Sequence, residues 1–381
     1  MFVAVTSEFL PTGLLPDIAR NLRVSEPQVG LLVSAFAATV VITSAPLTTF
    51  TRRVPRKSLV VFVLVGFALG NGLAAVAPNY DVLLVARIVS GFAHGLFGAV
   101  VGAYAGHMVP RRHLARAVAI TAAGGSAAFV LGVPLGTLLG HTVGWRLAFA
   151  VIGVIVLLLT LLVIRFLPAV DHRDELSTGE IALPLRRDPT IPAVILTCVI
   201  VVVLMMGQNT FYTYIAPYIA RVGGFGEDQV GVLLLLYGSA GVLGLAAAGS
   251  IGSRFPRFGV IGITAVLAVV IAVFGAAGQI QWAFIACLVL WGALMGSLPV
   301  LLQTRLLHDA SSRLRDVAAA YLTTAYNVAI GGGALLGGLL SDRLGLRSLP
   351  WAYFVFLIGV LVLMAGAELL RSCRARAVPT T

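Results

Sequence analysis

Two charged side chains, Glu8 and Arg87, lie inside long apolar stretches of this sequence. A charge at such a position costs several kcal/mol unless it is paired or hydrated, so it is expected to serve a purpose. Glu8 is about eleven residues from the end of its stretch, or ~16 Å along a helix, and Arg87 is about six residues, or ~9 Å, from the same side. We favour a glutamate that exchanges a proton under the influence of the arginine, and a static buried ion pair is the alternative.

His94 follows Arg87 by seven residues and therefore shares its helical face. It could relay protons, although a lone histidine in an apolar helix is more often a packing residue held by a hydrogen bond. We expect no metal and no cofactor, because Cys198, Cys287 and Cys373 lack paired spacing. A phosphate-binding loop would need Gly-Lys-Ser/Thr, and Lys57, the only lysine, follows an arginine. No nucleophile–base cluster occurs either, so the sequence predicts neither an enzyme nor an ATP-driven pump.

Polar and aromatic residues concentrate in two further segments, "GQNTFYTYIAPY" (207–218) and "YLTTAYNV" (321–328). Amides and hydroxyls carried on aromatic bodies suit a neutral amphipathic ligand. The candidate ligand-binding residues are Gln208, Asn209, Tyr212, Tyr321, Tyr326 and Asn327. Hydrogen bonding between helices is the alternative role for each of them.

Long apolar helices must position these residues, because 59% of the 381 residues are hydrophobic and only 11% are charged. About 20 apolar residues suffice to cross the ~30 Å hydrocarbon core of a bilayer. We predict an all-α polytopic membrane protein with twelve transmembrane helices. Their approximate ranges are 1–19, 27–50, 58–77, 82–107, 116–140, 147–168, 191–218, 227–252, 258–277, 281–307, 315–340 and 349–370.

The positive charge follows the alternation of the predicted loops, which explains the net charge of +11 without a nucleic-acid partner. With the N-terminus inside, nineteen of the 26 Lys and Arg residues fall on the inner side and six on the outer side, leaving Arg87 within a helix. This bias places both termini in the cytoplasm.

A repeat with an offset of 201 residues runs through the chain. "PDIARNLRVSEPQVG" (16–30) and "PYIARVGGFGEDQVG" (217–231) agree at eight of fifteen positions, and Gly132, Gly136 and Arg146 recur as Gly333, Gly337 and Arg347. We therefore predict two parallel six-helix repeats. The predicted boundaries are 1–168 for the first half, 169–190 for a cytoplasmic linker, 191–370 for the second half and 371–381 for a basic tail. By the same repeat the first helix should begin about ten residues before Met1, so we expect a native start upstream or a trimmed chain.

Several motifs make the chain resemble the major facilitator superfamily, and within it the twelve-helix drug:proton antiporter group. "TSEFLPTGLLPDIA" (6–19) resembles the first-helix signature of that group, and "LLVARIVSGFAHGLFGAVVGA" (83–103) its fourth-helix motif. "GVPLGTLLG" (132–140) resembles the fifth-helix antiporter motif, in which Gly132, Pro134 and Gly136 would permit close packing and bending. Bacterial chloramphenicol-resistance exporters and sugar efflux proteins look most similar.

The resemblance implies proton-coupled export of a small neutral compound, such as a drug or sugar, by alternating access. Such a protein would need only substrate, protons and the lipid bilayer as partners, and we expect a monomer. The family's cytoplasmic gating loop retains Arg53, Arg56 and Lys57, but Arg52 stands in place of the usual Asp. An importer or facilitator, or a non-transporting membrane sensor of the same fold, remains as an alternative.

Overall fold

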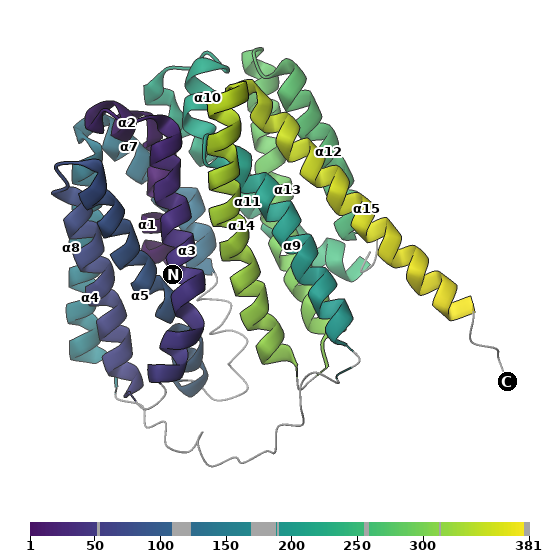
Figure 1. Ribbon diagram of the computed structural model, residues 1–381, viewed down its shortest axis with the longest axis horizontal. Helices are drawn as coiled ribbons and strands as arrows, with labels where there is room; N and C mark the ends of the chain where they lie inside the picture. The colour runs from purple at the N-terminus through teal and green to yellow at the C-terminus, as the bar shows by residue number, and fades with distance from the viewer. Residues whose placement is uncertain are drawn as a thin grey trace. The chain divides into compact units, whose positions relative to one another are not determined.

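The computed structural model describes residues 1–51, 54–108, 123–168, 188, 190–254, 259–311 and 314–376. Within these ranges the chain is helical and contains no strand, as Figure 1 shows. The helices are α1 (Phe2–Gly13), α2 (Leu15–Leu22), α3 (Glu26–Phe50), α4 (Arg56–Ala75), α5 (Tyr80–Met108), the π-helix η3 (Ala128–Gly132), α7 (Val133–Val143), α8 (Trp145–Phe166), α9 (Ile191–Tyr212), α10 (Ile215–Arg221), the short η6 (Glu227–Gln229), α11 (Val230–Arg254), α12 (Gly259–Ala277), α13 (Gln281–Asp309), α14 (Arg315–Leu344), the short η7 (Leu346–Ser348) and α15 (Leu349–Arg376).

Ten of the described helical segments are long and apolar enough to cross a membrane, and each matches one of the twelve predicted spans. The other two predicted spans are also helical. The first is divided into α1 and α2, which are too short singly, and the eleventh is α14, which has 30 residues but is less apolar. The all-α, multi-pass membrane fold predicted from composition is therefore confirmed.

Two equivalent helices are broken where the sequence predicted continuous spans. The first breaks at Leu14, between α1 and α2, and the second at Thr213–Tyr214, between α9 and α10. Pro16 and Pro217, which correspond through the 201-residue offset, lie just beyond these breaks. Because proline has no N–H and its ring clashes with the carbonyl four residues earlier, each disrupts the preceding turn.

The chain packs as two compact units, described separately below. Unit 1 contains Met1–Pro184 together with Thr213–Gly238, and unit 2 contains Leu185–Tyr212 together with Ser239–Thr381. The segment Thr213–Gly238, which carries α10, η6 and the start of α11, belongs by sequence to the second repeat. In the structure it packs with the first repeat, against α1, α2 and α7. The predicted half boundaries remain predictions from the sequence.

In unit 1, α1 crosses the η3–α7 helix at very close range. Hypothetical Cβ atoms on Gly132, Gly136 and Gly140 would lie 1.9 Å from Thr6 Oγ1, 2.7 Å from Leu10 Cδ1 and 2.4 Å from Leu14 Cδ2. Gly132 and Gly136, for which the motif predicted close packing, thus face the first helix. This close crossing places the segment that carries Glu8 directly beside α7.

Unit 2 is built around α9, which packs against α14 and α15, and around α12, which packs against α13 and α15. A Cβ on Gly333 of α14 would lie 2.6 Å from the Met206 carbonyl oxygen of α9. Trp291, which is fully buried, stacks on Phe211 with ring centroids 4.9 Å apart. The polar segment of α9 is therefore held between a helix of small residues and an aromatic core.

Candidate functional site

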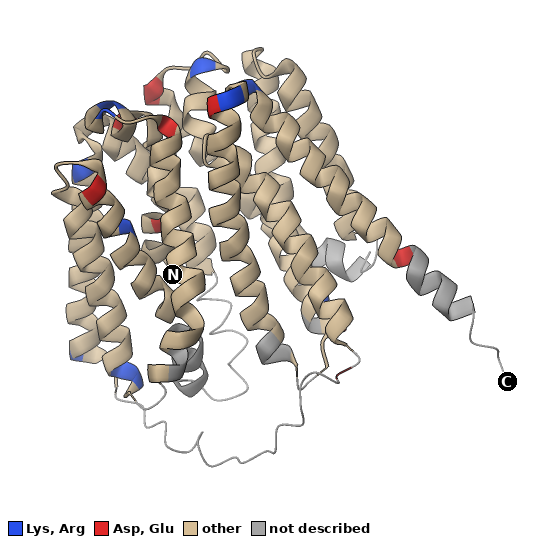
Figure 2. Cartoon of the chain, viewed as in Figure 1, with Lys and Arg blue, Asp and Glu red and all other residues tan. Residues whose placement is uncertain are grey.

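Glu8 on α1 and Arg87 on α5 are the only charged side chains that are buried among the described residues, at 4% and 1% exposure. Figure 2 shows that charged residues otherwise gather mainly near the ends of the helices. Since charge at depth must be compensated, these two residues mark the centre of the candidate site in unit 1.

Arg87 binds the backbone of α1 rather than the Glu8 carboxylate. Its Nη1 donates to the Ser7 carbonyl oxygen and its Nη2 to the Glu8 carbonyl oxygen, both at 2.7 Å. The guanidinium also lies 4.5 Å from the ring centroid of Phe36. The static ion pair considered from the sequence is not formed, and the Glu8 carboxylate is not held by the arginine.

Pro11 leaves one backbone carbonyl of α1 without its usual hydrogen-bond donor. Pro11 lies inside α1 and lacks the N–H that would bond to the carbonyl oxygen of Ser7, four residues earlier. Arg87 Nη1 takes that place. In the second repeat the equivalents of Pro11 and Arg87 are Tyr212 and Leu288, so the proline and the arginine occur together in one repeat only.

A second polar contact links α1 to α4 beside Glu8. Ser7 Oγ donates to Asn71 Oδ1 at 2.9 Å, and Asn71 Nδ2 donates to the Phe67 carbonyl oxygen at 2.8 Å. Both side chains are buried. Ser7 and Glu8 are thus fixed to α4 and α5 by hydrogen bonds that do not involve the carboxylate.

His94 lies in an aromatic pocket of unit 1. The rings of Phe36, Phe97 and Phe67 lie 5.3, 5.8 and 5.9 Å from its own, and its buried Nδ1 has no hydrogen-bond partner. No hydrogen bond joins it to Glu8 or Arg87 in the portion of unit 1 that the structure describes. A relay through His94 would therefore need an intervening water.

The polar residues predicted on α9 differ in their contacts. Gln208 Oε1 accepts a hydrogen bond from Trp291 Nε1 at 2.7 Å, and Asn209 Nδ2 donates to the Met205 carbonyl oxygen at 2.9 Å. Tyr212 is buried, with its ring nearly perpendicular to that of Trp291 at a centroid distance of 6.1 Å. All three residues are buried in unit 2, and Gln208 makes a hydrogen bond between helices, the alternative role considered for it.

On α14, Tyr326 and Asn327 carry buried polar atoms without a protein partner. Tyr326 Oη and Asn327 Oδ1 have no hydrogen bond, while Asn327 Nδ2 donates to the Thr323 carbonyl oxygen at 3.0 Å. Tyr321, by contrast, is 60% exposed in the described structure. The exposure of Tyr321 separates it from the other five candidates.

The two conformational motifs have clear local structures. The π-helix η3 ends at Gly132, and the N–H of Val133 bonds to the Ala128 carbonyl oxygen immediately before Pro134. Lys57 Nζ donates to the Ile164 carbonyl oxygen near the end of α8 at 2.9 Å, and Arg56 begins α4. Arg53 lies outside the described residues. The interruption at Pro134 is of the kind expected where a helix bends.

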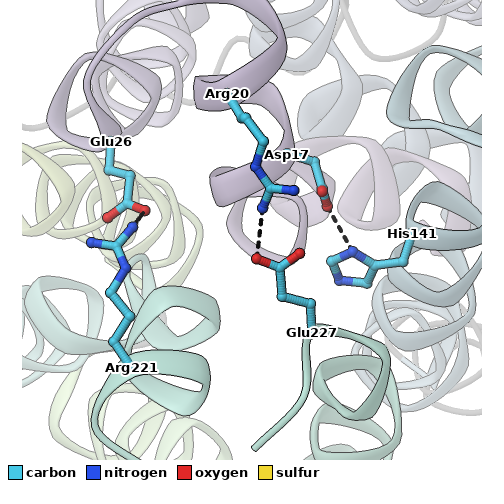
Figure 3. A network of polar contacts seen from close by, with 6 residues as sticks. All are labelled: Asp17, Arg20, Glu26, His141, Arg221 and Glu227. Carbon is cyan, nitrogen blue, oxygen red and sulfur yellow. Dashed lines mark hydrogen bonds and ion pairs between the residues drawn. The ribbon is translucent and has the colours of Figure 1, made fainter.

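Three ion pairs at one end of unit 1 were not anticipated from the sequence. Figure 3 shows Arg20 with Glu227, Arg221 with Glu26, and His141 with Asp17. A signal was available, because the arginines and the glutamates occupy equivalent positions in the repeated stretches 16–30 and 217–231. Repetition shows that positions correspond but not that they meet, so sequence alone could not pair them.

Comparison with known proteins agrees with this architecture. The chain is 32% identical over 364 residues to a protein named probable sugar efflux transporter from Helicobacter pylori (strain P12), covering 96% of this chain and 90% of the relative. It is 31% identical over 351 residues to a protein of the same name from Mannheimia succiniciproducens, covering 92% and 87%.

Two solved structures share the fold. A bacterial homologue of the human lysosomal transporter Spinster, inward-facing and occupied, has a TM-score of 0.75 at 15% identity and covers 96% of this chain and 94% of its own. A D-xylose–proton symporter has a TM-score of 0.77 at 15% identity, with 95% and 94% covered. The family model described as Major Facilitator Superfamily matches residues 1–332 and 197–376. The chain therefore belongs to the Major Facilitator Superfamily, whose members are multi-pass membrane transporters and not enzymes.

Proposed function

We propose that this transporter exports a small neutral polar compound, a sugar or a compound of similar polarity, in exchange for protons. The observation that carries the proposal is Glu8, the one acidic side chain that is buried among the described residues. Coupling to protons needs a group that can be charged in one access state and neutral in the other. A carboxylate that is not locked into an ion pair meets this need.

The buried polar groups of unit 2 favour a neutral substrate. Among its described residues no charged side chain is buried, and the buried side chains with an amide or an aliphatic hydroxyl are Thr197, Gln208, Asn209, Thr210, Thr264, Ser297 and Asn327. A buried polar atom without a partner costs about 1–3 kcal/mol, and a ligand hydroxyl could supply partners for Tyr326 Oη and Asn327 Oδ1. A sugar has such hydroxyls, and the similar proteins named above are described as sugar efflux transporters.

In the proposed cycle, Glu8 takes up a proton when it is reached from the outer, more acidic side, and substrate leaves there. When it is reached from the cytoplasm, Glu8 releases the proton and substrate binds. Arg87 is a positioning residue, because it donates hydrogen bonds to two successive carbonyl oxygens of α1, those of Ser7 and Glu8. The carboxylate can therefore change protonation without the helix losing its anchor.

Transport by Glu8→Gln in proteoliposomes tests the proposal. The assay uses labelled neutral sugars, a nucleoside and chloramphenicol, each measured as uphill transport driven by an imposed pH gradient and as exchange at equal pH. We expect Glu8→Gln to lose uphill transport and to retain exchange, because glutamine can bind but cannot titrate. Asp228→Asn, which removes an exposed acid, is the control and should transport normally.

Uphill transport by Glu8→Gln with unchanged proton movement would refute the coupling role. A wild-type protein that equilibrates its substrate without moving protons would be a facilitator. Absence of both substrate and proton movement for the whole panel would favour a sensor.

A further inference from the structure

Two of the ion pairs in Figure 3 are copies of each other through the repeat. Arg20 Nη2 lies 2.6 Å from Glu227 Oε1, and Arg221 Nη2 contacts Glu26 Oε1. Adding 201 to Arg20 gives Arg221, and adding 201 to Glu26 gives Glu227. Each repeat therefore gives its arginine to the other repeat's glutamate, as in a two-fold symmetric interface in which the same patch is used twice.

We propose that Arg20, Glu26, Arg221 and Glu227 form a latch that closes this end of the transport path and opens once in each transport cycle. Both pairs join the first repeat to the segment Thr213–Gly238, which belongs by sequence to the second repeat. Alternating access requires the two repeats to separate at one end while they close at the other. Both pairs must therefore break together when this end opens.

The four charges are placed so that they remain stable after the latch opens. Arg20 and Arg221 lie in the last turns of α2 and α10, and Glu26 and Glu227 in the first turns of α3 and η6. Cations are favoured at the C-terminal end of a helix and anions at the N-terminal end. Opening exchanges each partner for water but leaves each charge at a favourable helix end.

The exposure of three of the four side chains makes the pairs suitable as a reversible contact. The side chains are 63% and 48% exposed in the Arg20–Glu227 pair, and 59% and 12% in the Arg221–Glu26 pair. The exposed Arg20–Glu227 pair shifts an equilibrium by about fivefold or less, which biases two access states without trapping one of them. In the other pair Glu26 is largely covered, but Arg221 is exposed to water.

Two glycines, Gly30 of α3 and Gly238 of the segment itself, bring the segment Thr213–Gly238 close to the first repeat. A Cβ on Gly30 of α3 would lie 1.9 Å from Tyr214 Oη, and one on Gly238 would lie 2.5 Å from the Phe129 carbonyl oxygen. Tyr214 is fully buried, so separation at Gly30 exposes its ring to water. The contact is close in both places and carries no long interlocking side chain on the glycine side.

The third ion pair is not part of the latch. His141 Nδ1 lies 2.6 Å from Asp17 Oδ2, but both residues belong to the first repeat, on α7 and α2. Their equivalents through the offset are Asp342 and Tyr218, so the pair has no copy. It connects helices that move together, and it is expected to persist when the latch opens.

Labelling of a buried cysteine tests the latch. Thr213, at the junction of α9 and α10, is fully buried, so Thr213→Cys in a background without Cys198, Cys287 and Cys373 reports opening at this end. Right-side-out and inside-out vesicles are both treated with a membrane-impermeant maleimide, so the orientation need not be assumed. We expect Arg20→Glu with Arg221→Glu to raise the labelling rate about tenfold from one side only, since the effects of two independent pairs multiply.

Restoring the pairs with the charges exchanged provides the decisive comparison. Adding Glu26→Arg and Glu227→Arg to the two arginine variants should return the labelling rate to within about twofold of the parent, because opposite charges face each other again. The controls are Arg23→Glu and Asp228→Arg, which reverse exposed charges near the latch that have no ion pair in the described structure, and they should leave the rate unchanged.

An unchanged rate in the double arginine variant would overturn the latch, as would equal effects of the controls or failure of the exchanged charges to restore protection. The readout is cysteine access, which does not depend on the substrate or on protons. The latch and the proposed sugar–proton exchange can therefore fail separately.

Discussion

Arg87 replaces a backbone hydrogen-bond donor that α1 lacks because of Pro11. A proline inside a helix leaves the carbonyl four residues earlier without its usual donor, and in an apolar interior that carbonyl must find another. Arg87 Nη1 donates to the Ser7 carbonyl oxygen at 2.7 Å, so a charged side chain completes the backbone bonding of α1. The buried arginine thus has its hydrogen-bond partners in the backbone of α1 and not in the Glu8 carboxylate.

This account predicts a compensating double substitution. Arg87→Leu alone should destabilise the protein by about 1–3 kcal/mol, because the Ser7 carbonyl oxygen loses its donor. Pro11→Ala in the same chain supplies an N–H and should recover at least half of that loss. The double variant resembles the second repeat, where Tyr212 and Leu288 stand at these positions.

Thermal unfolding of all four proteins in detergent gives the coupling energy. Strict additivity of the two substitutions would show that Arg87 does not replace the missing donor. Pro11→Thr, which also restores the N–H, should behave like Pro11→Ala and excludes an effect of the alanine side chain.

At the scale of the elements, close helix crossings hold the candidate site. The antiporter-like motif predicted close packing at Gly132 and Gly136, and the structure places both, with Gly140, against α1. The breaks at Leu14 and Tyr214 were not predicted, although Pro16 and Pro217 were visible in the sequence. Hydropathy shows whether a stretch is long and apolar enough to span the membrane. It does not show whether the helix is broken, because a broken helix and a straight one can have the same composition.

The crossing of α1 and η3 predicts a strong effect of a single methyl group. A Cβ on Gly132 would lie 1.9 Å from Thr6 Oγ1, so Gly132→Ala must push the two helices apart. We expect a loss of stability of about 1–3 kcal/mol and reduced transport, because α1 carries Glu8. Thermal unfolding and the proteoliposome assay measure the two effects.

Gly262→Ala in α12 is the matched control, since nothing lies within 4 Å of the added methyl group. There the substitution should stabilise the helix by about 0.5–1 kcal/mol. If Gly132→Ala behaved like Gly262→Ala, the close crossing would be wrong.

At the scale of the whole molecule, the sequence predicted most of the architecture and part of the site. Long apolar stretches and the constant offset of 201 residues were enough for the membrane fold and for a duplicated chain. Glu8 and Arg87 were found because charge at depth is rare. Composition does not determine helix rotation or side-chain direction. It therefore could not predict the partners of Arg87, the pairing of Arg20 with Glu227 or the exposure of the Tyr321 side chain.

At this scale the last prediction concerns the orientation of the molecule in the membrane, which we infer from the distribution of Lys and Arg between the predicted loops. Nineteen Lys and Arg residues lie on the side predicted to be inner and six on the other, so the C-terminus should be cytoplasmic and the latch should face outward. A protease-sensitive tag at the C-terminus should be cut in inside-out vesicles only. Asp228→Cys, exposed beside Glu227, should react with an impermeant maleimide in right-side-out vesicles only. Reaction of both probes from the same face would contradict the five predicted spans between residue 228 and the C-terminus, because an odd number of spans places the two probes on opposite faces. Reversal of both would leave the fold intact and would place the latch on the cytoplasmic side, where its opening would admit substrate to be exported instead of releasing it.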